Sequence, residues 1–157
     1  MTKSQITLVT LAILLLFTSA YYNTPADGRV GYQAPELLLG NEDDDIHLNA
    51  WRGQYVLVTF WASAQPESRI ANMRYDRAAS QLAVKHLSVN LDESERLWKQ
   101  LVAVDGLAPG GQRHCELSHH SALRRVWRQN GTFCSFLIAP DGKIVSKNPS
   151  LRDLRQL

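Results

Sequence analysis

The stretch from Val56 to Arg69 constrains the fold of this chain more than any other segment. It opens with a continuous apolar run, Val56 to Trp61, whose β-branched and aromatic side chains are typical of a central strand buried on both faces. Small and polar residues then interrupt the run, and a helical pattern begins at Ser68. A strand that leads into a helix places the connecting loop at the carboxyl end of a sheet, where α/β proteins usually hold their ligands. We therefore expect the functional site in this loop.

Strands and helices alternate along the rest of the chain. Further strands are predicted over residues 46–48, 84–90, 112–115, 134–138 and 143–146, and helices over residues 68–81, 95–104, 118–127 and beyond Pro149. The first helix is expected to bury Ile70, Met73, Ala78 and Leu82. From the central strand onward the order is β-α-β-α-β-α-β-β-α, which predicts an α/β fold with a central mixed sheet flanked by helices.

Three segments resemble the exported TlpA-like group of thiol–disulfide oxidoreductases in the thioredoxin-like superfamily. Phe60-Trp61-Ala62-Ser63 and Arg69 match the active-site segment of that group, which reads F-W-A-x-W-C-x-x-C-R. The run from Gly31 to Leu37 is similar to its G-x-x-A-P entry, and the run from Phe136 to Val145 is similar to its closing hairpin. The resemblance spans residues 31–157 and implies a thioredoxin-like fold with an inserted helix and edge strand.

The catalytic positions of this group are substituted. Gln65-Pro66-Glu67-Ser68 stands where the family has Cys-x-x-Cys, and Phe133 stands where it has a cis-proline. Disulfide exchange needs a thiolate, Gln65 has no ionisable group, and no base for the Ser68 hydroxyl is evident nearby in the sequence. We expect Ser68 or Glu67 to satisfy free N–H groups at the helix start, and a trans peptide bond before Phe133 because cis bonds before other residues cost about 2.5–4 kcal/mol. Ordinary Cys-x-x-Cys catalysis is excluded.

The two cysteines of the chain, Cys115 and Cys134, leave three readings open. They form a disulfide, one of them supplies a relocated thiol activity, or both are inert core residues. The expected sheet order separates them by three strand spacings, about 14 Å, which exceeds the Cα separation of about 7 Å that a disulfide tolerates. The sequence therefore favours free cysteines near the vacant catalytic loop.

His114, Cys115, His119 and His120 form a weak candidate metal site for copper or zinc. The thioredoxin-fold copper chaperones take a cysteine pair from the loop that holds residues 65–68 here, and that pair is absent. A helix also separates adjacent residues such as His119 and His120 by about 100°. No resident metal or other cofactor is expected.

The first 22 residues read as a signal peptide or an N-terminal membrane anchor, since Ile6 to Ala20 is mostly apolar after Lys3. Residues 23–30 read as a linker and residues 31–157 as the domain. The formal net charge of +2 gives no support for nucleic-acid binding. We expect an exported protein, either periplasmic or anchored through residues 6–22 and facing the periplasm.

The leading hypothesis is a protein- or peptide-binding module without Cys-x-x-Cys activity, and therefore not an enzyme. Trp61 and Phe133, with Trp51, are the candidate binding aromatics, provided that they are exposed near the loop. The runner-up is a non-canonical thiol oxidoreductase that uses Cys134 or Cys115, with a role in redox homeostasis or cytochrome c maturation that the resemblance implies. A copper or zinc carrier is the third hypothesis.

Overall fold

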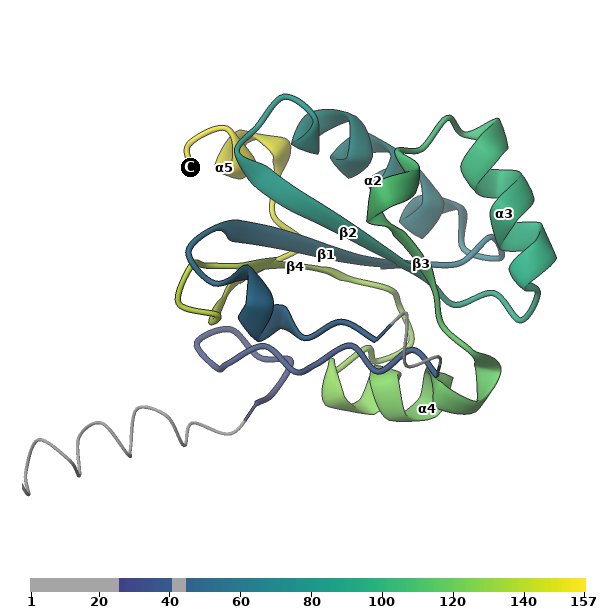
Figure 1. Cartoon of the computed structure of the whole chain (residues 1–157), viewed down its shortest axis with the longest axis horizontal. Helices are drawn as coiled ribbons and strands as arrows, with labels where there is room; N and C mark the ends of the chain where they lie inside the picture. Colours follow the sequence, from purple (N-terminus) through teal and green to yellow (C-terminus); the bar gives the residue numbers. More distant parts are fainter. Residues whose placement is uncertain (1–25, 41–44) are drawn as a thin grey trace, which may run out of the picture.

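The computed structural model describes residues 26–40 and 45–157, so the predicted signal or anchor at residues 1–22 lies outside the described residues. Its centre is a five-stranded sheet in the order β3-β2-β1-β4-β5 (Figure 1). The strands are β1 (Tyr55–Trp61), β2 (Val84–Asn90), β3 (Gln112–His114), β4 (Ser135–Ile138) and β5 (Ile144–Lys147). β1, β2 and β3 are parallel, whereas β4 and β5 are antiparallel to their neighbours. The mixed sheet and the strand order that the sequence predicts are confirmed.

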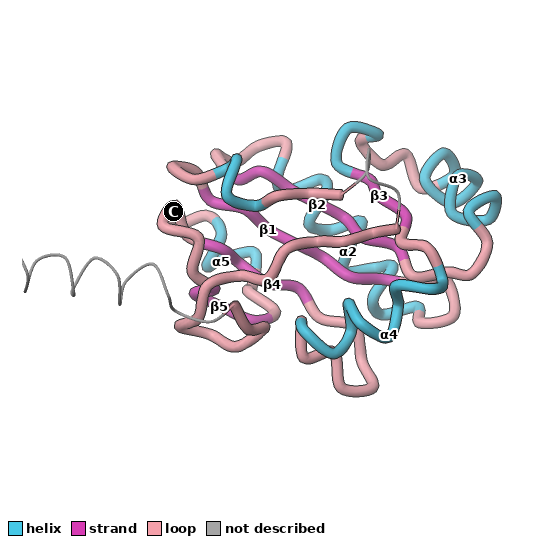
Figure 2. The backbone as a smooth tube through the Cα atoms, turned by 60° about the horizontal axis from the view of Figure 1, so that its bottom comes forward, coloured by secondary structure: helices cyan, strands magenta, loops and turns pink. Residues whose placement is uncertain are grey.

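Helices cover both faces of this sheet. They are α2 (Pro66–Ala79), α3 (Glu95–Val104), α4 (Leu117–Val126) and α5 (Leu151–Leu154), with short 3-10 turns η1 (Leu48–Trp51) and η2 (Pro109–Gly111). α2 and α5 lie above the sheet in the view of Figure 1, and α4 lies below it; Figure 2 shows the same elements from a second side. The strand predicted over residues 46–48 is wrong, because Ile46 forms only an isolated bridge with Leu37. The C-terminal helix is a single turn.

The face of the sheet toward α4 is apolar. Val56, Val58 and Phe60 of β1 point to this face and pack in one buried cluster with Trp127 and Phe136. The Phe60 ring lies 5.3 Å from the Trp127 ring and 6.1 Å from the Phe136 ring, centroid to centroid. Such tilted aromatic contacts add to the free energy of burial. The end of β1, and with it the start of the loop, therefore stands on a well-packed base.

The face toward α2 is partly polar, because β1 and β2 alternate their side chains between the two faces. Leu57, Tyr75 and Leu137 belong to its apolar cluster, but Thr59 and Ser88 are fully buried on strands of the same sheet. α2 begins at Pro66, two residues before the predicted start, and its buried residues are Ser68, Asn72 and Tyr75. The prediction that Ile70 is buried is wrong, since this side chain is 48% exposed.

Residues 26–40 run along the α4 side of the sheet (Figure 1). Gly28 N donates to the carbonyl of Val126, and Asp27 N donates to the carbonyl of Gln33. The predicted linker is therefore packed against the domain from Ala26 onward, while residues 23–25 lie outside the described residues. Within the described ranges, no helix combines the length and the apolar character that crossing a membrane requires.

Candidate functional site

The loop between β1 and α2 is held by hydrogen bonds that involve the two substituted positions. The Ser68 hydroxyl is buried, donates to the carbonyl of Gln65 at 2.7 Å and accepts from Ala62 N at 3.2 Å. Its proton is thus committed to a carbonyl, which makes Ser68 a structural clamp and a poor nucleophile. The expectation that its hydroxyl satisfies an N–H group of the helix is wrong, because the N–H that it accepts from belongs to Ala62, before the helix.

Gln65 connects this loop to the segment before β4. Its position is the N-cap of α2, and its side-chain Nε2 donates to the carbonyl of Gly131 at 3.4 Å. Gly131 precedes Phe133 by two residues, so the two family positions that are substituted here lie on adjacent loops. The structure therefore brings Gln65, Ser68 and the Phe133 segment together, as the resemblance implies.

Phe133 is half-buried and packs against the apolar cluster of the α4 face. The Arg124 guanidinium lies over its ring, 4.8 Å from the centroid. No peptide bond between described residues is cis, which confirms the prediction of a trans bond before Phe133. Phe133 is therefore held between the core and Arg124, with only part of its ring open to solvent.

A buried carboxylate, Asp92, joins the carboxyl ends of β1, β2 and β3. It accepts from Ser63 N at 2.9 Å, from the Ser63 hydroxyl at 2.8 Å and from Asn90 Nδ2 at 2.8 Å. The ring Nε2 of His114 contacts the Asp92 carbonyl at 2.8 Å and must therefore carry its proton there. Sequence reasoning missed this network, although an acidic residue two positions beyond a buried strand was its visible signal.

A shallow hollow of about 320 Å³ lies beside the loop, between α2 and the end of α3. It is lined by Ser63, Pro66, Arg69, Ile70, Met73 and Asp105. We call this surface the loop hollow. Its apolar wall is formed by Pro66, Ile70 and Met73, so the exposure of Ile70 places an aliphatic side chain where a partner can reach it.

The opposite wall of the loop hollow is an ion pair between α2 and α3. Arg69 Nε donates to one Asp105 oxygen at 2.7 Å, and Arg69 Nη2 donates to the other at 2.5 Å. This two-point contact raises the pKa of the Arg69 guanidinium, chiefly through the hydrogen bonds from Asp105. The hollow therefore offers an apolar strip next to a charge-neutral polar edge.

Neither cysteine is placed for thiol chemistry. Both are free, and the Cys115 side chain is fully buried. Burial, helped by the carboxylates of Glu116 and Asp45, raises the pKa of the Cys115 thiol to about 12. Cys134 is 6% exposed and its Sγ lies 3.7 Å from the carbonyl of Thr132. Because exchange needs an accessible thiolate, the structure agrees with the reading of free core cysteines and shows no disulfide between them.

The candidate metal ligands of the sequence do not converge. His114 points to the Asp92 carbonyl, His120 Nε2 lies 2.9 Å from the Cys115 carbonyl, and His119 Nδ1 lies 2.9 Å from the Ser118 hydroxyl. In residues 26–40 and 45–157, no group of three or more His, Cys, Asp or Glu side chains is arranged to hold a metal ion. The candidate ligands are close together in the sequence, but their side chains do not form a metal site in the part of the chain that the structure describes.

The two tryptophans expected to be exposed near the loop are not available there. Trp61 is fully buried, and its indole Nε1 donates to the Ser88 hydroxyl at 2.8 Å. Trp51 precedes β1 and carries the Lys85 ammonium over its ring at 3.9 Å, at the opposite end of the strand from the loop. Naming Trp61 as a binding residue is wrong, because the alternation of β1 turns it under α2.

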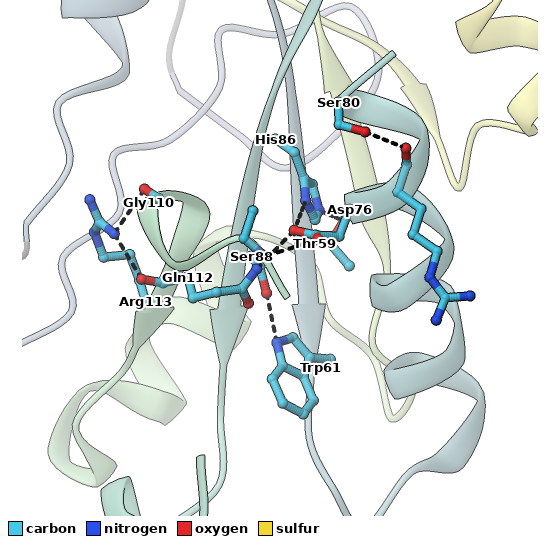
Figure 3. Close-up of polar contacts among 11 residues, drawn as sticks. Thr59, Trp61, Asp76, Ser80, His86, Ser88, Gly110, Gln112 and Arg113 are labelled. Carbon is cyan, nitrogen blue, oxygen red and sulfur yellow. Dashed lines mark hydrogen bonds and ion pairs between the residues drawn. The ribbon is translucent and has the colours of Figure 1, made fainter. Parts of the chain in front are cut away.

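A hydroxyl, an imidazole and a carboxylate also line up beneath α2, as Figure 3 shows. His86 Nε2 lies 3.1 Å from the Thr59 hydroxyl, and His86 Nδ1 lies 3.5 Å from the Asp76 carboxylate. Burial raises the pKa of Asp76, but the contacts with His86, the Ala108 N–H and Gln112 outweigh it and leave that pKa below its ordinary value. The order resembles that of a hydrolase triad. Thr59 is fully buried, however, so the arrangement ties α2 to the sheet and cannot reach a substrate.

Comparisons with known proteins place these features in context. No protein-family model matches the chain, and no curated protein matches it. Several solved structures, however, match the chain. A thioredoxin-like protein from Parabacteroides distasonis matches with a TM-score of 0.72 and 25% sequence identity, over 83% of this chain and 95% of the other.

Two further structures agree with that match. The thioredoxin domain of a thiol-disulfide oxidoreductase from Bacteroides vulgatus gives a TM-score of 0.61 at 24% identity, over 85% of this chain and 95% of the other. A thiol:disulfide interchange protein from a Bacteroides species gives 0.66 at 23% identity, over 82% and 86% of the two chains. Each of these similarities covers more than four fifths of this chain.

Proposed function

This protein belongs to the thioredoxin-like superfamily, and we propose that it is an exported module that binds extended polypeptide without exchanging disulfides. The observation that carries the proposal is the chemistry of the loop before α2. Gln65 and Ser68 occupy the two catalytic positions, and their side chains make structural hydrogen bonds. The scaffold is kept, but the atoms that attack a disulfide are missing.

The cysteines elsewhere in the chain do not replace them. Cys115 has a pKa of about 12 and a side chain closed to solvent, so its thiolate population near neutral pH is negligible. Cys134 is buried in the same apolar cluster. No contact of either thiol favours the alternative of a relocated thiol enzyme.

The loop hollow is the surface that we assign to the partner. Ile70 is 48% exposed, and the Arg69–Asp105 pair joins α2 to the end of α3. An aliphatic strip on a rigid surface, bordered by hydrogen-bonding groups, suits an apolar side chain of an extended segment. The partner class is therefore unfolded or extended polypeptide.

Export is part of the same proposal. The apolar run from Ile6 to Ala20 follows a single lysine, as in signal peptides and short anchors. The partner is therefore expected outside the cytoplasm, in the periplasm if the source is a bacterium with two membranes. Fusion of residues 1–25 to a reporter enzyme that is active only after export checks this part directly.

The test uses the full-length chain and reduced, carboxymethylated ribonuclease A as a permanently unfolded polypeptide without thiols. We expect binding that is seen as chemical-shift changes at the loop hollow, and insulin reduction no faster than the uncatalysed rate. Ile70→Lys should weaken binding at least fivefold. The matched control is Val145→Lys, because Val145 is 46% exposed on β5 and thus similar in exposure to Ile70.

Two outcomes would overturn the proposal. One is turnover of insulin disulfides at a rate typical of Cys-x-x-Cys proteins. The other is equal binding of the unfolded polypeptide to the wild type and to Ile70→Lys, or chemical-shift changes that are confined to residues far from the loop hollow.

A further inference from the structure

A second hollow lies between α2 and α5. It has a volume of about 410 Å³ and is lined by Ala71, Arg74, Tyr75, Pro149, Ser150 and Leu151. Figure 1 shows α5 beside the later part of α2 on the same face of the sheet. We call this surface the α2–α5 groove. None of its lining residues belongs to the loop hollow.

The wall of the α2–α5 groove is mostly apolar. The Tyr75 hydroxyl is not available to a ligand, because it donates to the carbonyl of Pro149 at 2.7 Å. Ala71 and Leu151 pack against the same apolar cluster to which Tyr75 belongs. These groups present hydrocarbon to whatever enters, and the volume falls in the range of about 300–1,000 Å³ that small-molecule sites occupy.

The groove continues into a basic extension. A neighbouring hollow of about 230 Å³ shares Arg74 and Leu151 with it and adds Arg77, Ala78, Gln81 and Arg155. Three arginines therefore line one continuous surface, and no carboxylate lines either part of it. All three guanidinium groups are on exposed residues.

These arginines have no anionic partner within the described part of the chain. Asp76 of α2 is engaged with His86 and Gln112 on the side facing the sheet, and Asp153 of α5 accepts from Ser150 N in a capping box. Arg77 lies in the last turn of α2, where the helix dipole favours a cation. Arg74 lies mid-helix and has no such stabilisation, so uncompensated positive charge stands beside an apolar wall.

We propose that the α2–α5 groove binds a small amphipathic anion, with a phosphate or carboxylate head at the three arginines and a hydrocarbon body against Ala71, Tyr75 and Leu151. Guanidinium groups bind both oxyanions through two parallel hydrogen bonds. The apolar wall supplies the affinity that a bare anion lacks, because solvated surface charges alone bind weakly. The groove is a site of its own and does not depend on the polypeptide site.

The test titrates the full-length chain with probes that separate head from tail, all below their micellar concentrations. Octyl phosphate and octanoate carry both parts, octyl glucoside has the tail with a neutral head, and inorganic phosphate has the head alone. We expect one or both of the anionic octyl probes to bind at least tenfold tighter than octyl glucoside and inorganic phosphate. The shifted amide signals should lie in residues 71–81 and 149–155.

Two variants and one control assign the contacts. Arg74→Gln removes the charge and keeps a polar side chain, and Ala71→Leu fills the groove without changing charge; each should weaken octyl phosphate binding at least fivefold. Arg96→Gln removes an exposed arginine of α3 outside the groove and should leave binding unchanged. The stronger of the two anionic probes identifies the head group that is preferred.

Each contrary result refutes the proposal. If octyl glucoside bound as tightly as the anionic octyl probes, the groove would recognise only the hydrocarbon chain. If inorganic phosphate bound as tightly, the arginines would recognise only the charged head. An equal loss in Arg96→Gln would mean binding by overall charge. Signals that shift only around the loop hollow would place the ligand at the other site.

Discussion

At the scale of single residues, two side chains decide what the loop before α2 can do. Gln65 and Ser68 stand three residues apart at the start of a helix, the same spacing as the cysteines of a Cys-x-x-Cys motif. The helix N-terminus that stabilises a thiolate is still present. What is lost is the pair of sulfur atoms.

Restoring both sulfurs should therefore restore disulfide formation. The Gln65→Cys/Ser68→Cys variant is expected to form a reversible internal disulfide, and its first thiol should have a pKa below the ordinary value of a cysteine because of the helix N-terminus. Thiol counting before and after mild oxidation measures the first effect, and the pH dependence of alkylation measures the second. The single variant Gln65→Cys is the control, since it cannot close the bridge; two free new thiols after oxidation would contradict the geometry.

The Cys115 thiol should make stability fall at alkaline pH. Its pKa is raised from 9.0 to about 12 in the folded state, so its contribution is present below pH 9 and is lost as the pH rises toward 12. Between these values the unfolded chain has released the proton and the native chain keeps it, which lowers the free energy of unfolding by about 1.4 kcal/mol per pH unit. Urea unfolding at pH 8 and pH 10 should show the stability advantage over Cys115→Ala shrinking by about this amount. A constant difference would rule out burial as the cause.

At the scale of elements, α2 packs one side against the sheet and presents the other side to solvent. Ser68, Asn72 and Tyr75 face the sheet, where Asp76 also meets His86. The other side carries Ile70 in the loop hollow and Arg74 in the α2–α5 groove. Both proposed sites therefore share one helix.

The Arg69–Asp105 pair should be a strong tie between α2 and α3. Asp105 is 5% exposed at its side chain and Arg69 31%, so Arg69→Met leaves a nearly buried carboxylate unpaired and should cost about 2 kcal/mol, between the values of surface and buried pairs. Denaturant unfolding measures this loss.

Two controls define the origin of that loss. Arg69→Met combined with Asp105→Leu should recover at least half of it, because no charge is then left buried. Lys99→Met breaks the exposed Lys99–Glu95 pair on α3 and should change stability by less than about 0.5 kcal/mol. Equal losses in Arg69→Met and Lys99→Met would contradict a buried role for Asp105.

At the scale of the whole molecule, residues 26–40 close the α4 side of the sheet. Gly28 is the tightest contact in that segment, because a Cβ there would lie 2.4 Å from the carbonyl carbon of Trp127. Trp127 is itself fully buried in the apolar cluster. The backbone of Trp127 cannot retreat without disturbing Phe60 and Phe136, whose rings contact its own.

Gly28→Ala should therefore destabilise the entire domain by about 2 kcal/mol, the usual size of an overpacking defect. Gly110→Ala is the matched control, since a Cβ at Gly110 meets nothing within 4 Å, and it should change stability by no more than about 0.5 kcal/mol. Thermal or urea unfolding of the two variants gives the comparison. A neutral Gly28→Ala would mean that the segment is not part of the cooperative unit.

Much of the fold follows from local pattern. The strand over residues 84–90 and the helix over residues 95–104 begin and end where the sequence predicts, because an alternating run and an amphipathic run carry their own periodicity. The sheet order, in contrast, was predicted through the resemblance to the thioredoxin-like superfamily. The absence of thiols at the two catalytic positions can also be read from the sequence, because it depends only on the identities of Gln65 and Ser68.

The surfaces, in contrast, were decided by tertiary structure. Trp61 reads as a binding aromatic until the register of β1 turns it under α2, and Ile70 reads as core until the polar inner side of α2 turns it outward. The basic extension of the α2–α5 groove brings together Arg74 and Arg155, which are 81 positions apart in the chain. By itself the sequence determined the pattern of strands and helices and the absence of sulfur at positions 65 and 68, because these depend on local periodicity and atom type. Which side chains meet and which face solvent depends on how elements pack, and only the folded chain decides that.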